Sequence, residues 1–278
     1  MEQAPPDMRP TTVLITGCSS GLGFATAVAF ASDPSYRVIA TMRCAPTDAP
    51  ALRLLSALPA AAVMASAISP HPRIRIATLD VTDSASVAAL KDLVAAEYDG
   101  AVDVLVNNAG YGAPGAIETV PVEAAQRCFD VNVWGPVRLI QALVPGMRAR
   151  HRGVIVNVSS TSGLRGIAAY DVYTASKFAL EGLCESMRYA LAPDNIHVLM
   201  VNPGPVRTPF LERFESELAP SPSAPTATPD DPDPDPGLDR LRRLNAGMLD
   251  LLRARMEAPG AQTAEEVGAA VAAAAAAA

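Results

Sequence analysis

Short apolar runs rich in β-branched residues alternate with longer helical patterns along most of the chain. The runs occupy residues 12–15, 37–40, 74–77, 102–106, 154–158 and 197–201. Most are apolar on both alternating faces, as strands of a parallel sheet covered on both sides must be. Helical periodicity is clearest in residues 84–98, 122–150 and 172–191. The alternation predicts βαβ units and an α/β fold with a doubly wound parallel sheet of the Rossmann type.

Two segments interrupt this alternation. Residues 45–70 are rich in Ala, Pro and Leu and predict one helix with a loop. Residues 220–236, PSPSAPTATPDDPDPDP, cannot bury apolar surface and predict a disordered insertion. The segments on either side of it, 210–218 and 238–256, resemble helices with one apolar face. We therefore expect a single domain over residues 1–278, in which residues 210–258 form a lid over a substrate pocket.

The composition narrows the functional classes. With 278 residues, half of them apolar, the chain can bury a sizeable core. Its net charge of −7 and its lack of a basic block argue against a nucleic-acid partner. The four cysteines lack the spacing of metal ligands, so we expect no metal site and reduced thiols in an intracellular protein. No signal-peptide pattern and no apolar run of about 18 residues is visible, which predicts a cytoplasmic protein without a transmembrane span.

A glycine-rich segment, TGCSSGLG at residues 16–23, lies between the first apolar run and a helical stretch. Glycines allow a tight turn there and let backbone N–H groups approach a pyrophosphate, whose charge the following helix N-terminus favours. A plain turn is the alternative, but the position between the first strand and a helix favours a dinucleotide site.

The end of the second run indicates which dinucleotide binds. An NAD enzyme usually carries an acidic residue there for the ribose 2′-hydroxyl. This chain instead has Ala-Thr-Met-Arg at residues 40–43. Arg43 can pair with a 2′-phosphate, and Ser20 could add a hydroxyl, although Arg43 could also be merely solvated. The sequence favours NADP(H) as the cofactor.

Tyr173 and Lys177 are four residues apart on a predicted helix and therefore share a face. A free phenol has a pKa near 10, and a nearby ammonium lowers that value, which would make Tyr173 a usable acid/base. Ser160 ends an earlier strand, where ligands bind in open α/β sheets, and could bond the substrate oxygen. Asn132, on another helix, could order a water molecule to Lys177 or could simply be a polar residue at a helix contact.

Taken together, these segments resemble the short-chain dehydrogenase/reductase family. TGCSSGLG at 16–23, NNAG at 107–110, the serine at 160, YTASK at 173–177 and PGPVRT at 203–208 match its motifs in order and spacing, over residues 11–210. Within the family, DVYTASKFALEGLCES at 171–186 is most similar to the branch of 17β-hydroxysteroid and photoreceptor retinol dehydrogenases.

The resemblance implies a role for each matching position. The catalytic set would be Ser160, Tyr173, Lys177 and Asn132, and Asn107 would brace the sheet. The cofactor would contact Gly17, Ser19, Ser20, Gly21, Leu22, Gly23, Arg43, Asp80, Val81, Asn108, Ala109, Gly110, Tyr173, Lys177, Pro203, Gly204, Val206 and Thr208. Hydride transfer would interconvert an alcohol and a ketone, with a bulky apolar compound of the steroid or retinoid type as substrate. The family also implies a homo-oligomer formed through the helical segments 122–150 and 172–191.

The resemblance fades after residue 210. Residues 238–256 lack the aromatic and His positions of the steroid branch, and Tyr170 stands where that branch tends to have Asn. No seventh strand is visible after the helical stretch 264–278. A reductase of another lipid or of a small carbonyl compound is therefore an alternative, as is a non-catalytic NADP(H)-binding sensor or scaffold.

Overall fold

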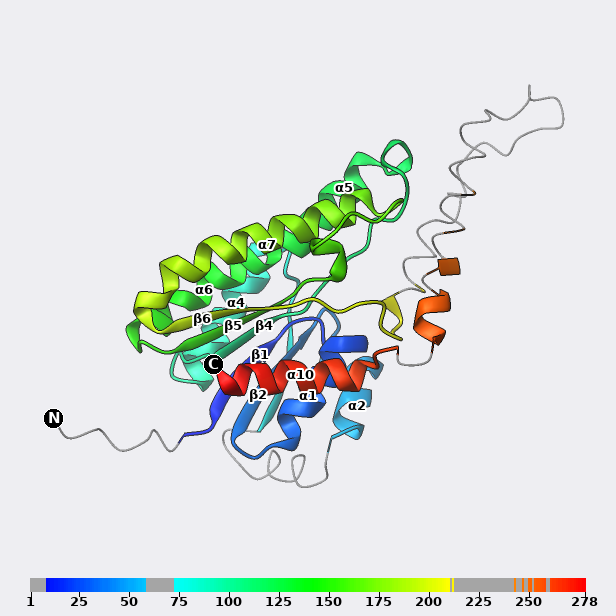
Figure 1. The fold of residues 1–278 in the computed structure, drawn as a ribbon. Coiled ribbons are helices and arrows are strands. Elements are labelled where there is room, and N and C mark those ends of the chain that lie inside the picture. Colours follow the sequence, from blue (N-terminus) through cyan, green and yellow to red (C-terminus); the bar gives the residue numbers. More distant parts are fainter. Residues whose placement is uncertain are drawn as a thin grey trace.

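The computed structural model describes residues 9–58, 73–210, 212, 243, 247, 250, 251, 253–258 and 261–278. A parallel sheet of six strands occupies its centre, in the order β3-β2-β1-β4-β5-β6 (Figure 1). The strands are β1 (Thr11–Ile15), β2 (Tyr36–Met42), β3 (Ile74–Thr78), β4 (Val104–Asn107), β5 (Gly153–Val158) and β6 (Ile196–Val201). The predicted doubly wound α/β fold is confirmed.

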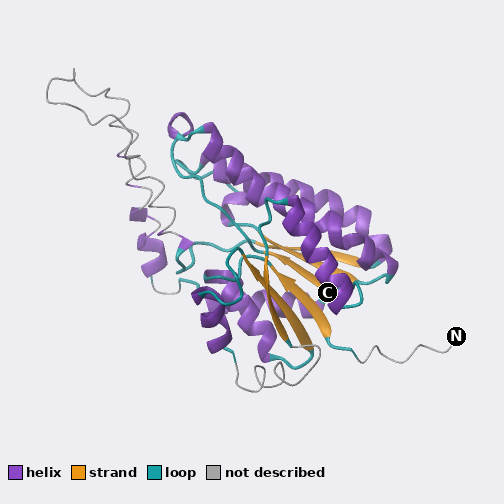
Figure 2. Ribbon diagram, turned by 180° about the vertical axis from the view of Figure 1, so that it is seen from behind, coloured by secondary structure: helices purple, strands orange, loops and turns teal. Residues whose placement is uncertain are grey.

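Helices cover both faces of the sheet (Figure 2). One layer contains α1 (Gly21–Ser32), α2 (Ala49–Ser56) and α10 (Ala264–Ala277). The other contains α4 (Ser84–Glu97), α5 (Val122–Phe129), α6 (Gly135–Ala149) and α7 (Asp171–Leu191). Short helical turns also occur at Ile117–Thr119, Asp130–Trp134, Thr161–Gly163 and Ala192–Asp194.

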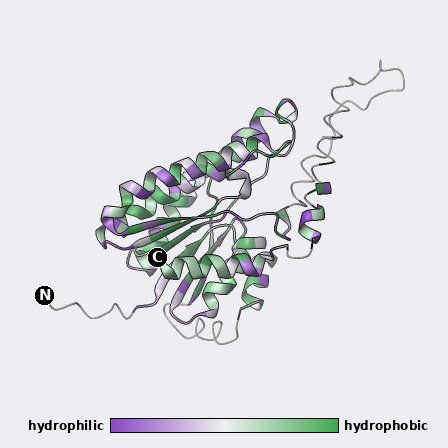
Figure 3. Ribbon diagram, viewed as in Figure 1, coloured by the Kyte–Doolittle hydropathy of each residue, from purple (hydrophilic) through white to green (hydrophobic). Residues whose placement is uncertain are grey.

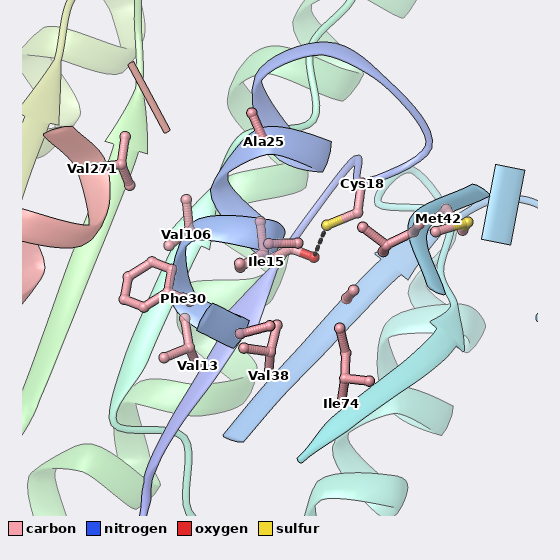
Figure 4. Packing of buried hydrophobic residues seen from close by; sticks show 14 of the residues in the cluster. Val13, Ile15, Cys18, Ala25, Phe30, Val38, Met42, Ile74, Val106 and Val271 are labelled. Atoms are coloured by element: carbon pink, nitrogen blue, oxygen red, sulfur yellow. Dashed lines mark hydrogen bonds between the residues drawn. The ribbon is translucent and has the colours of Figure 1, made fainter. Parts of the chain in front are cut away.

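Successive side chains of each strand point to opposite faces of the sheet, so the core consists of two clusters, one under each helical layer. Val13 and Ile15 of β1 join the cluster beneath α1 and α10, whereas Leu14 joins the cluster beneath α4, α6 and α7. Figure 4 shows the first cluster, in which Phe30 of α1 lies between the strands and α10. The strands are apolar on both faces because helices bury both faces.

Helix α10 closes the first layer against α1. Its N-terminus carries a capping box, in which Thr263 Oγ1 accepts from the Glu266 N–H at 3.2 Å and Glu266 Oε2 accepts from the Thr263 N–H at 2.8 Å. Alanine and valine make up most of its length, which is pale green in Figure 3. Small side chains let α10 approach the α1 backbone closely.

The predicted helix over residues 122–150 forms, but it is not a regular α-helix throughout. Asp130–Trp134 is a π-helical turn, closed by the Gly135 N–H donating to the Asp130 carbonyl. Pro136 lacks the N–H that an α-helix would give to the Asn132 carbonyl, which favours this wider turn.

The prediction of one helix within residues 45–70 agrees with α2, although residues 59–72 lie outside the described residues. The expected lid over 210–258 is described only at Phe210, at a few isolated positions and at residues 253–258, of which 253–257 are helical. The predicted insertion at 220–236 lies entirely outside the described residues.

The close approach of α10 to α1 predicts a contrast between two glycines. A Cβ on Gly268 would lie 2.8 Å from backbone atoms of Ala25 and Thr26, whereas a Cβ on Gly182 in α7 would meet nothing within 4 Å. We expect Gly268→Ala to lower the free energy of unfolding by about 1–2 kcal/mol. Gly182→Ala should raise it by up to about 1 kcal/mol, because alanine favours the helix. Urea denaturation measures both, and equal effects would contradict this account of the α1–α10 contact.

Candidate active site

A cavity of about 900 Å³ opens at the carboxyl ends of the six strands. Its walls come from the segments that follow these strands, which is where open α/β sheets bind ligands. The sequence-predicted residues on its walls are Gly17, Ser19, Ser20, Gly21, Leu22, Arg43, Asp80, Val81, Asn108, Ala109, Gly110, Ser160, Tyr173, Lys177, Pro203, Gly204, Val206 and Thr208. Gly23 and Asn132 are not among the wall residues.

The glycine loop after β1 has the backbone that its sequence predicts. Gly17 has a φ of 73° and Gly21 a φ of 60°, which favour glycine. A Cβ on Gly17 would also lie 3.0 Å from the Cα of Ala109. A Cβ on Gly23 would collide with Gly17 and Asn108, so Gly23 allows close packing behind the loop and lies off the cavity wall.

Thr16 fixes the glycine loop against the end of β4, a role that was not predicted from the sequence. Its Oγ1 accepts from the N–H groups of Asn108 and Ala109, each at 2.9 Å. The Asn108 amide Nδ2 donates back to the Thr16 carbonyl at 2.7 Å. Deeper in the sheet, Asn107 Nδ2 donates to Asn157 Oδ1 at 2.8 Å, which agrees with the expected bracing role of Asn107. The TGxxxGxG and NNAG motifs are therefore joined by hydrogen bonds.

Arg43 and Asp80 line the part of the cavity next to the ends of β2 and β3. Arg43 is exposed at the end of β2 and lies on the cavity wall. Partial burial tends to raise the pKa of Asp80. Hydrogen bonds from the Thr82 hydroxyl and N–H, together with the charges of Arg43 and Arg138, outweigh that effect and lower the pKa below its ordinary value. A cation therefore faces this end of the cavity beside a carboxylate that stays ionised.

Tyr173 and Lys177 share one face of α7 and are both buried. Lys177 Nζ donates to the Val158 carbonyl at 2.9 Å and lies 5.6 Å from the centre of the Tyr173 ring. The Ser160 hydroxyl hydrogen-bonds the Tyr173 phenol, and Ser160 Oγ also accepts from the Ser162 N–H at 3.1 Å. The three side chains that the sequence grouped are thus brought together at the end of β5.

The predicted origin of the Tyr173 acidity needs correction. Burial raises the pKa of the Tyr173 phenol well above its ordinary value of 10.0, and the hydrogen bond from Ser160 only partly opposes that rise. Burial also lowers the pKa of the Lys177 amine from 10.5 to about 8. The spacing of the two residues correctly indicated a shared face, but it could not show how strongly both groups are removed from water.

Asn132 is buried in the π-helical turn, and its side chain bonds the backbone and a neighbouring helix. Its Oδ1 accepts from the Tyr111 N–H at 2.8 Å, and its Nδ2 donates to the Tyr111 carbonyl at 2.9 Å and to Ser176 Oγ at 2.9 Å. These bonds fit the polar helix-contact alternative for the side chain. The bond to Ser176 links Asn132 to the residue of α7 that directly precedes Lys177.

Apolar and aromatic residues surround Tyr173 on the side away from the glycine loop. The Tyr170 ring meets the Tyr173 ring edge-on at 5.5 Å, and the Phe210 ring lies 5.9 Å from it. Ile167 and Met256 pack against the same cluster and line the cavity. None of these was a predicted site residue. Ile167 and Tyr170 come from the segment between β5 and α7, and Phe210 and Met256 come from the chain after β6.

The cavity residues fit a nicotinamide dinucleotide. Helix α1 begins at Gly21 on the cavity wall, and the Ser20 side chain does not cap it. An uncapped helix N-terminus next to a glycine turn suits a pyrophosphate.

Among the described residues there is no group of three or more His, Cys, Asp or Glu side chains that could hold a metal. No helix in the described part of the chain is long and apolar enough to cross a membrane.

Comparisons with known proteins agree with this geometry. The family model for short chain dehydrogenases matches residues 11–219. Human 17-beta-hydroxysteroid dehydrogenase type 1 is 45% identical over 208 residues, covering 74% of this chain and 60% of the human protein. Human retinol dehydrogenase 8 is 45% identical over 203 residues, covering 72% of this chain and 60% of that protein.

A solved structure of a serine dehydrogenase in its closed form, complexed with NADP⁺, superposes with a TM-score of 0.69 at 25% identity. That superposition covers 94% of this chain and 87% of the other. The chain thus spans about 60% of the length of the two human relatives and most of this solved structure. The resemblance indicated by the motifs is confirmed, and the chain belongs to the short-chain dehydrogenase/reductase family.

Proposed function

We propose that this protein is an NADP(H)-dependent oxidoreductase that interconverts a bulky apolar alcohol and the corresponding ketone. The observation that supports this most directly is the grouping of Tyr173, Ser160 and Lys177 on one wall of the cavity, beneath an apolar cluster. Family membership and the dehydrogenase relatives agree with it.

The dinucleotide would lie along the cavity from Arg43 to Tyr173. The loop from Gly17 to Leu22 would hold its phosphates, and Asp80, Val81, Asn108, Ala109 and Gly110 would contact the adenosine and ribose side. Pro203, Gly204, Val206 and Thr208 would hold the nicotinamide, with Lys177 on its ribose. When bound, the nicotinamide supplies or accepts the hydride.

Tyr173 supplies the proton in the reduction direction. Its raised pKa keeps the phenol protonated at neutral pH. Proton transfer to the developing alkoxide is still favourable, since an alkoxide is a stronger base than a phenolate. When substrate binds, the Ser160 hydroxyl would turn its single proton from the phenol oxygen to the developing alkoxide and stabilise the alkoxide charge.

Lys177 positions the phenol and supplies positive charge beneath it. Its hydrogen bond to the Val158 carbonyl holds the amine at the base of the cavity. The pKa of about 8 leaves the amine mostly charged at neutral pH, close enough to its titration point to exchange a proton. We propose that Asn132 acts on this relay by positioning Ser176 and Tyr111.

The substrate pocket is predominantly apolar beyond Tyr173. Ile167, Tyr170, Phe210 and Met256 would cover the body of the substrate. A steroid- or retinoid-like compound fits this lining, and the two human relatives are named for such compounds. Another lipid or a small carbonyl compound is the alternative substrate.

The proposed homo-oligomer would use the exposed apolar residues of the second helical layer. Trp134 and Val122 are 54% and 66% exposed, and Phe178 of α7 is 47% exposed. Helices of this layer are the ones through which the family resemblance implies pairing.

Replacing the phenol tests the proposed chemistry. We expect Tyr173→Phe to lower kcat for ketone reduction about 1,000-fold, because a general acid contributes roughly 10²–10⁴-fold. NADPH binding should remain. NADPH consumption with panels of ketosteroids, retinal and small carbonyl compounds measures the rate, and Tyr189→Phe, at an exposed position of the same helix, is the control. Equal rates for Tyr173→Phe and the unchanged protein would contradict the proposed function.

The buried amine predicts a pH-dependent stability. Between pH 8 and 10.5 the unfolded chain holds a proton on Lys177 that the folded chain has lost, so stability rises with pH in this window. In Lys177→Met this contribution disappears. The stability of the variant relative to the unchanged protein should be highest below pH 8 and fall by roughly 1.4 kcal/mol per pH unit above it. Urea denaturation from pH 7 to 9 measures the difference, and a constant difference would show that the amine is not desolvated.

Arg43 determines the expected cofactor preference. Arg43→Ala should lower the ratio of kcat/KM for NADPH to that for NADH about ten- to a hundredfold, because a guanidinium–phosphate pair is lost. Lys91→Ala, at an exposed position on α4, serves as the control for loss of one surface cation. An unchanged protein that prefers NADH would refute the assignment of Arg43.

A further inference from the structure

Two arginines line the apolar half of the cavity. Arg165 lies two residues before Ile167, and Arg255 lies directly before Met256. Ile167 and Met256 both pack against the cluster around Tyr173. Both arginines are themselves cavity-wall residues. Two positive charges therefore stand beside the surface that would cover the substrate.

Neither arginine is neutralised by the described protein. The acidic residues on the cavity wall are Asp80 and Asp130. Asp130 pairs with Arg138 at 2.7 Å, and Arg138 also bonds the Val81 carbonyl next to Asp80. These carboxylates thus belong to the dinucleotide side of the cavity. Within the part of the chain that the structure describes, no ion pair or hydrogen bond involves the side chain of Arg165 or Arg255.

The catalytic tyrosine and the two arginines differ in their exposure to solvent. Tyr173 is 7% exposed, whereas Arg165 and Arg255 are both exposed. The reacting carbon must therefore lie deep, while the two guanidinium groups lie near the mouth. Leu251, one helical turn before Arg255, lines the same wall, so one face of this helical segment presents an apolar and a cationic side chain together.

A third cavity-lining arginine, Arg127, is not part of this pair. It also borders a separate open depression on α5 and the π-helical turn, lined by Val122 and Trp134. Its charge is shared with that surface, so we assign it no role at the substrate.

We propose that the substrate of this site is amphipathic: an apolar body with the reacting carbonyl or alcohol at one end and a carboxylate or sulfate at the other, bound by Arg165 and Arg255. This inference rests on the proposed function and specifies its substrate class. An apolar neutral substrate would leave two cations facing the cavity without a counter-charge. A guanidinium presents donors in the planar arrangement that carboxylate and sulfate oxygens match.

Matched pairs of substrates that differ only in charge test this. One pair is a long-chain keto acid and its methyl ester, and the other is a 17-ketosteroid and its 3-sulfate, each reduced with NADPH. We expect kcat/KM for the anionic member to exceed that of the neutral member by about tenfold at low salt in at least one pair, mainly through KM. The pair that shows the preference identifies whether carboxylate or sulfate is recognised. The preference should shrink as salt is added, because the arginines are exposed.

Substitutions of Arg165 and Arg255 test whether these two residues cause the preference for anionic substrates. Arg165→Gln and Arg255→Gln should each lower kcat/KM for the anionic member about threefold, and together bring the ratio close to one, with the neutral member unchanged. Arg165→Lys and Arg255→Lys retain the charge and should preserve most of the preference. Arg188→Gln, at an exposed position of α7 outside the cavity, should change nothing.

The outcomes separate this inference from the function on which it rests. Turnover of the neutral compounds that requires Tyr173, with no preference for either anion, would overturn the amphipathic substrate and leave the oxidoreductase proposal standing. A preference that persists in the double Gln variant would overturn the assignment to these arginines. Absence of turnover with all four compounds would overturn both.

Discussion

The hydrogen bond from the Lys177 amine to the Val158 carbonyl is the interaction on which the site depends. Val158 is the last residue of β5, and Lys177 lies in the second turn of α7, so this bond ties a helix to the carboxyl end of the sheet. Because Ser160 follows Val158 by two residues, the same contact brings its hydroxyl to the Tyr173 phenol. One buried donor therefore sets the relative position of three side chains from two elements.

Burying that amine has an electrostatic cost, which the lowered pKa of Lys177 reflects. The phenol beside it is also desolvated, so both groups favour their neutral forms more than they would in water. The two pKa values have therefore moved apart, so the phenol keeps its proton at neutral pH while the amine gives one up more readily than it would in water. The tuning arises mainly from the exclusion of water, with the Ser160 hydroxyl as the main opposing influence on the phenol.

A second set of hydrogen bonds positions the opposite wall of the cavity. Thr16 accepts from two consecutive backbone N–H groups after β4, and Asn108 returns a bond to the chain before the glycine turn. Glycine at position 23 leaves room for the Asn108 side chain behind the loop. The glycine loop is therefore held by the adjacent strand end, and its exact place does not depend on the loop residues alone. Beyond these two walls, the cations Arg165 and Arg255 stand at the mouth, where an apolar lining meets solvent.

The sheet, the order of its elements and the chemical character of most cavity residues could be predicted from the amino-acid pattern. These predictions rest on local properties of the chain, namely the strand and helix periodicities, the glycine spacing and the four-residue interval between Tyr173 and Lys177. Each depends on backbone geometry within one element, so it does not require knowledge of the tertiary structure. The tertiary structure alone decided the roles of Thr16 and Phe210, because their contacts join segments far apart in the chain. It also decided the pKa directions at Tyr173 and Lys177, since these depend on how much water the surrounding elements exclude, and no interval between residues encodes that quantity.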